Sequence, residues 1–317
     1  MGGRSVGAKE IRSYYAQRKE WSSVTNASQV FKETNMQDEF NPAKIKLPRE
    51  ACDSPDSPHS RGIIFAEDVT GSMGFFLLDL ITKQFPRLIT STYSAVSYNP
   101  HIMFMGVGDV EFDEAPLQVT QFEADLRMLD QLQKIWLEKR GGYNNYESYI
   151  LPWYFAAKCI KMDCYDKRGE KGFLFTFGDE YPTPYITSRS LKKVFGENLD
   201  LSGEPSQYTN LDLLEMAEEK FYCYHVILQG NGYSSGVVND WKQLMGSHAL
   251  DLTHHEFLPE LVTSVLKMYE GVPKADVING IEDVYARDVV SHALETHEEI
   301  VKENAVSIEQ NAQIDVF

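Results

Sequence analysis

The chain has 317 residues, of which 30 are basic and 47 acidic, so its formal charge at neutral pH is −17. Hydrophobic residues make up 43% of it, which is enough for a packed core and excludes general disorder. The acidic balance argues against nucleic acid and anionic membranes as partners, because binding to either needs clustered lysine and arginine.

The sequence contains no run of about 18 apolar residues, so it predicts no membrane span. Its polar start lacks the apolar core of a secretory signal. The four cysteines lie at irregular spacings that fit no zinc motif. We therefore expect reduced, mostly buried thiols in a cytoplasmic protein.

The two ends of the chain differ from the middle. Residues 1–60 carry 9 basic and 8 acidic side chains (+1), whereas residues 270–317 carry 3 and 11 (−8). A short polar helix fits residues 8–21, and four prolines in residues 41–61 predict an irregular arm. The sequence predicts three parts: an N-terminal arm over 1–60, one domain over 61–270, and an acidic helical extension over 271–317 with a helix at about 275–303.

Within the middle part, apolar runs alternate with amphipathic stretches. Continuous apolar runs, typical of strands buried on both faces, occupy residues 62–67, 101–107, 172–177 and 221–228. Helical spacing predicts helices at 75–89, 123–138, 147–161, 210–220, 237–245 and 255–269, with short strands at 116–122 and 249–252. The stretch before residue 210 is polar and is expected to be a loop.

This alternation predicts an α/β fold, a Rossmann-like doubly wound and mostly parallel sheet with helices on both faces. In such folds ligands bind outside the carboxyl ends of the strands. Three of the predicted strands deliver an acidic residue there: Asp68, Asp109 and Asp179, the last followed by Glu180.

Converging buried carboxylates need protons or cations. Asp68, Thr70 and Ser72 are alternate residues in a loop before a helix, so their oxygens can curl around one ion. An oxygen-only donor set suits Mg²⁺, Mn²⁺ or Ca²⁺ rather than zinc. The alternative is that Thr70 or Ser72 only caps the helix.

The segment Asp68-Val69-Thr70-Gly71-Ser72 resembles the Asp-x-Ser/Thr-x-Ser motif of von Willebrand factor A (vWA) domains, and it is similar above all to intracellular prokaryotic or phage-type members. The resemblance covers the strand–helix order of residues 61–270. It implies that the motif forms a metal-ion-dependent adhesion site (MIDAS), with Asp179 binding the ion directly or through water.

One element of the vWA pattern is missing, because the glycine-rich turn at 141–148 contains no Thr. Asn144 or Glu147 is the candidate replacement ligand. Alternatively, this turn only starts a helix, with Asn145 as its cap. Asp109 and Glu180 are expected near the ion as water-holding or partner-contacting residues, although Asp109 also fits a solvated loop.

The resemblance implies a protein-binding adaptor without enzyme activity, whose metal captures an Asp or Glu of a partner protein. In this family an AAA+ ATPase of the MoxR type is one such partner. Two alternatives stay open: a hydrolase whose metal activates water, with Asp109 or Glu180 as base, and a structural assembly protein with a degenerate site.

Overall fold

The computed structural model describes residues 7–18, 24–70, 74–138, 146–229, 234–298 and 300. A six-stranded sheet lies at its centre, made of β2 (Ser60–Asp68), β3 (Asn99–Val107), β4 (Leu117–Val119), β7 (Gly172–Gly178), β11 (Phe221–Leu228) and β12 (Ala249–Leu252). The strands run in the spatial order β12-β11-β7-β2-β3-β4. All neighbours pair in parallel except β4, which is antiparallel to β3.

Helices cover both faces of this sheet. One face packs against α2 (Gly74–Asp79), the π-helical turn η4 (Leu80–Gln84), α3 (Phe85–Ala95), α10 (Leu258–Tyr269) and α12 (Val284–Ala293). The other packs against α5 (Ile150–Cys159), α8 (Asn210–Glu218) and α9 (Ser235–Met245). The predicted α/β class is therefore confirmed, and it is consistent with the A-domain fold that the sequence resemblance implies.

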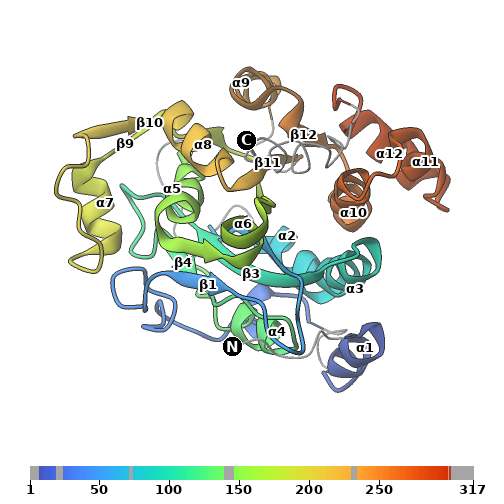
Figure 1. Ribbon diagram of the computed structural model, residues 1–317, viewed down its shortest axis with the longest axis horizontal. Coiled ribbons are helices and arrows are strands. Elements are labelled where there is room, and N and C mark those ends of the chain that lie inside the picture. Colours follow the sequence, from blue (N-terminus) through green and yellow to red (C-terminus); the bar gives the residue numbers. More distant parts are fainter. Residues whose placement is uncertain are drawn as a thin grey trace, which may run out of the picture.

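The arms pack on this domain. In Figure 1 α1 (Ala8–Ala16) lies beside α3 at the lower right, and Ile11 and Tyr14 of α1 join the core on that face. Residues 49–51 form β1 (Arg49–Ala51), which pairs in parallel with β6 (Ile160–Met162). Between residues 272 and 298 the chain forms two helices, α11 (Lys274–Asn279) and α12, instead of one continuous helix from 275, and residues 301–303 of the expected helix lie outside the described residues.

Two predicted helices are shorter than expected because their ends pair with other segments. The 123–138 stretch contains only α4 (Arg127–Leu132), since Glu123 forms a backbone bridge with Ile102. The 147–161 stretch starts late because β5 (Tyr146–Glu147) pairs with β8 (Tyr181–Pro182), and it ends where β6 begins and leads into α6 (Asp163–Arg168).

The stretch before residue 210 is not the expected loop. It contains a hairpin of β9 (Tyr185–Thr187) and β10 (Gln207–Thr209), and between these strands lies α7 (Ser188–Phe195). Figure 1 shows this unit at the left edge of the molecule, away from the C-terminal helices on the right. Thr187 caps α7 by accepting a hydrogen bond from the Ser190 amide, and α7 buries Leu191, Val194 and Phe195.

No helix of the described ranges has the length and apolar character needed to cross a bilayer. All four cysteines are free thiols, and Cys159, Cys164 and Cys223 are buried, as expected from the sequence.

Phe65 lies at the centre of the core, fully buried on the middle strand β2. Its ring centroid is 5.9–6.0 Å from those of Phe104, Phe175 and Phe177 on the two neighbouring strands. Replacement by Ala removes these contacts and leaves a cavity. We expect Phe65→Ala to lower the free energy of unfolding by about 3–5 kcal/mol in urea titrations.

Phe112→Ala is the matched control, because that side chain is 49% exposed and its loss should change stability by at most about 0.5 kcal/mol. Equal effects of the two substitutions would contradict this assignment of the core.

Candidate functional site

The strand order of the sheet reverses between β2 and β7. Numbered along the chain, the sheet strands run 3-2-1-4-5-6 from β4 to β12, which is the doubly wound order. The crossover from β2 to β3 runs through α3 on one face, and the crossover from β7 to β11 runs through α8 on the other. Ligands bind at such a switch point, just beyond the strand ends. Here those ends are Asp68 and, directly after β7, Asp179.

Asp68 is fully buried and held on both carboxylate oxygens. The Thr70 backbone amide and hydroxyl donate to Oδ1 at 2.8 and 2.6 Å, and the Tyr149 hydroxyl lies 3.2 Å from Oδ2. Burial, followed by the negative charge of Asp179, raises the pKa of Asp68 to about 7, although the Thr70 hydrogen bonds act in the opposite direction.

Tyr149 reaches Asp68 by crossing directly over a glycine. A Cβ atom on Gly178 would lie only 1.8 Å from the Tyr149 hydroxyl and 2.4 Å from its Cζ. The tyrosine ring is fixed from the other side by His225 and Trp241, with ring centroids at 4.9 and 5.6 Å. The last residue of β7 must therefore be glycine for this hydrogen bond to form.

Glu147 comes to the same edge of the sheet from a third segment. The pairing of β5 with β8 sets its backbone, and its carbonyl accepts a hydrogen bond from the Thr183 hydroxyl at 2.6 Å. Its side chain is buried, and Oε2 has no hydrogen-bond partner within the described residues. Burial first, and then the charges of Asp68, Asp113, Asp109 and Glu180, raise the pKa of Glu147 to about 11.

Asp109 comes from a fourth segment, the loop after β3. Its side chain is buried, so the alternative of a solvated loop carboxylate is wrong. Its Oδ1 accepts a hydrogen bond from the Glu111 amide at 2.7 Å, and its own amide donates to Asp113 Oδ2 at 2.6 Å. Asp113 is also buried, and its pKa is raised to about 6 by burial and by the charges of Glu138 and Asp109.

Glu180 and Glu67 complete the acidic surroundings. Glu180 is half-buried, its carbonyl accepts a hydrogen bond from Trp241, and burial and Asp179 raise its pKa. Glu67 precedes Asp68 on β2, so it points to the opposite face of the sheet. Neither of its buried carboxylate oxygens has a hydrogen-bond partner among the described residues, and burial raises its pKa well above the usual value.

The structure thus brings together six of the residues expected from the sequence. These are Asp68, Thr70, Asp109, Glu147, Asp179 and Glu180. Ser72 and Asn144 lie outside the described residues. Within the described parts of the chain, no three His, Cys, Asp or Glu side chains are arranged to hold an ion by themselves. The expected ligand set also includes hydroxyl and amide oxygens.

Two contributors were not singled out from the sequence. These are Tyr149 and Asp113. The position of Asp113, four residues after Asp109 in a turn after a strand, is a signal that was present in the sequence. The role of Tyr149 depends on its passage over Gly178, which belongs to a different strand and leaves no local signal.

The fold and this cluster of acidic side chains define a doubly wound α/β protein with a polar site at its switch point. No protein-family model and no curated protein matches the sequence. Among solved structures, the pilus adhesin SpaC from Lactobacillus rhamnosus GG in its open conformation is similar at 12% identity and a TM-score of 0.44, over 67% of this chain and 30% of the adhesin. A second crystal form of SpaC gives 10% identity and 0.42, over 74% and 31%. This chain thus matches about a third of the adhesin, and a likeness at this level carries no argument about the site.

The close approach of Tyr149 to Gly178 can be tested by a double-mutant cycle. Gly178→Ala forces the tyrosine off Asp68, so we expect it to lower the free energy of unfolding by about 1–3 kcal/mol or more in urea titrations. In a Tyr149→Leu background the clashing atoms are absent, and the same substitution should cost clearly less. Purely additive effects would show that the two residues do not interact.

Proposed function

We propose that this chain is a divalent-metal-dependent protein-binding module with no enzyme activity. The ion is Mg²⁺, with Mn²⁺ or Ca²⁺ as substitutes, and its ligands are Asp68, Thr70, Ser72 and Asp179, completed by Asn144 or Glu147. Asp109 and Glu180 hold waters or contact the partner. An open position on the ion binds an Asp or Glu carboxylate of another protein.

The observation that supports this proposal most directly is the concentration of buried carboxyl groups at the switch point. Four chain segments contribute carboxylates there, and mutual repulsion contributes to the raised pKa values of Asp68 and Glu147. A divalent cation offsets such charges, and the donor atoms are all oxygens, as a hard ion prefers. The resemblance of residues 68–72 to the vWA motif points to the same chemistry.

The protein's own residues have separable roles in this proposal. Thr70 and Tyr149 orient the Asp68 carboxylate through their hydrogen bonds. His225 and Trp241 pack against the Tyr149 ring and hold it in place. The ion supplies the positive charge that attracts the partner's carboxylate. The proposal of an AAA+ ATPase as that partner rests on the family resemblance alone. The proposal of a cytoplasmic location rests on the cysteine content.

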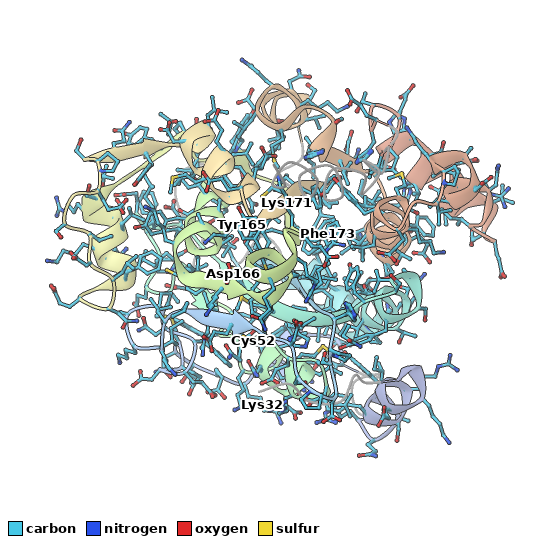
Figure 2. All side chains as sticks on the ribbon, in the orientation of Figure 1. Lys32, Cys52, Tyr165, Asp166, Lys171 and Phe173 are labelled. Atoms are coloured by element: carbon cyan, nitrogen blue, oxygen red, sulfur yellow. The ribbon has the colours of Figure 1, made fainter. Side chains whose placement is uncertain are left out.

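The metal is tested by thermal unfolding at increasing Mg²⁺, Mn²⁺ and Ca²⁺. We expect at least one ion to raise the melting temperature of the wild type saturably, since an ion at 100 times its Kd stabilises by about 2.7 kcal/mol. Asp68→Asn, which keeps the shape of the side chain, should lose this shift. Asp166→Ala should keep it, because Asp166 is exposed on α6, which leads into the amino end of β7 (Figure 2).

An equal response of wild type and Asp68→Asn to every ion would refute the metal site. Turnover of phosphoester or peptide substrates by the metal-loaded wild type, lost in Asp68→Asn, would instead favour the hydrolase.

A further inference from the structure

A basic groove lies next to the acidic cluster, the buried acidic side chains Asp68, Asp109, Glu147 and Asp179 at the sheet edge. It has a volume of about 1070 Å³ and is lined by residues of α7 and β9 and by Val110 and Glu111 of the loop after β3. Its charged residues are three cations, Arg189, Lys192 and Lys193, and one acid, Glu111. This balance is opposite in sign to that of the whole chain, which carries −17.

One loop, residues 109–113, lies between the groove and the acidic cluster. On one side, Asp109 and Asp113 of this loop act on the pKa of Glu147, and on the other side Val110 and Glu111 line the groove. Lys193 ties the loop to α7, because its ammonium donates to the carbonyls of Val110 at 2.6 Å and of Asp113 at 3.0 Å. The 109–113 loop therefore borders both the acidic cluster and the groove.

Two of the three cations are available to a ligand. Arg189 is exposed and has no ion pair or hydrogen bond within the described residues, and Lys192 is engaged only in an exposed pair with Glu197. Exposed pairs of this kind contribute little and are readily exchanged. Lys193, by contrast, is engaged with the loop carbonyls and positions the wall of the groove.

Exposed aromatic side chains lie along the same rim. Three of the seven large hydrophobic side chains most exposed in the described chain are Phe112 (49%), Tyr146 (42%) and Tyr185 (49%). Phe112 lies on the separating loop, Tyr146 is adjacent to Glu147, and Tyr185 lines the groove. Aromatic residues beside arginine are typical of protein-binding surfaces rather than of plain solvated ones.

We propose that this groove binds an acidic, extended segment of the partner protein. The segment continues from the carboxylate at the ion, crosses the 109–113 loop, and places further Asp or Glu residues against Arg189 and Lys192. This inference rests on the proposed metal-dependent function. It adds that Arg189 and Lys192, which lie outside the metal site, bind the partner's acidic residues.

The test uses the full chain and two labelled 16-residue peptides in fluorescence anisotropy. Both peptides carry one leading Asp, followed either by a Glu-rich stretch or by the same stretch with Gln in place of Glu. In Mg²⁺ we expect the Glu peptide to bind the wild type about three- to tenfold more tightly than the Gln peptide. Arg189→Glu combined with Lys192→Glu should abolish this difference.

Lys9→Glu combined with Arg12→Glu is the matched control, because it reverses an exposed Lys–Arg pair at the same helical spacing on α1, far from α7 in Figure 1. This variant should keep the preference for the Glu peptide. Equal binding of both peptides to the wild type, or equal losses in both double variants, would overturn the inference. The inference would also be overturned if a single-stranded oligonucleotide bound at Arg189 and Lys192 more tightly than the Glu peptide does.

Failure of the groove and failure of the metal site are distinguishable. If chelation or Asp68→Asn has no effect while the α7 variant weakens the Glu peptide, the groove stands and the proposed function fails. If chelation weakens both peptides while the α7 variant has no effect, the metal site stands and the groove inference fails.

Discussion

The buried carboxylate of Asp68 is the constraint on which the site depends. It ends the central strand of the sheet, where it is removed from water, and three donors from Thr70 and Tyr149 surround its oxygens. A buried carboxylate without such donors costs several kcal/mol. The tyrosine donor in turn requires Gly178 on β7, so two neighbouring strands and the start of α5 are fixed relative to one another by this one group.

The same constraint explains why the site is built from separate segments. β2, β7, the loop after β3 and the β5–β8 pair each bring an acidic residue to one edge of the sheet. Each added carboxylate raises the pKa of the others, so the edge is destabilised as long as no cation is present. Stability elsewhere offsets this effect, notably in the phenylalanine cluster around Phe65. A stable core that offsets a destabilised edge of the sheet is typical of a protein with a binding site at that edge.

The sequence was sufficient to predict the sheet and the acidic strand ends. Continuous apolar runs identify β2, β3, β7 and β11, and in a parallel sheet such strands must present their following residues at one edge. The β9–β10 hairpin and α7 were not predicted, because they are short and mostly polar, and their stability comes from burying Leu191 and Phe195 against the domain. Tyr149 was not predicted for a related reason, since Asp68 and Gly178, which it contacts, lie on the strands β2 and β7. The metal-ligand roles of all these site residues, including Ser72 and Asn144, remain predictions.

The charge distribution links the metal site and the groove. An acidic chain repels an acidic partner at long range, yet at physiological ionic strength charges are screened beyond about 8 Å. The helices α11 and α12, which belong to the acidic C-terminal part, pack beside α10, at the opposite side of the molecule from α7 in Figure 1. Under the two proposals, a partner at the rim responds mainly to the ion and to Arg189 and Lys192. Because these positive groups lie on both sides of one loop, they favour a segment with acidic residues at two points, and such two-point binding sets direction and register as well as affinity.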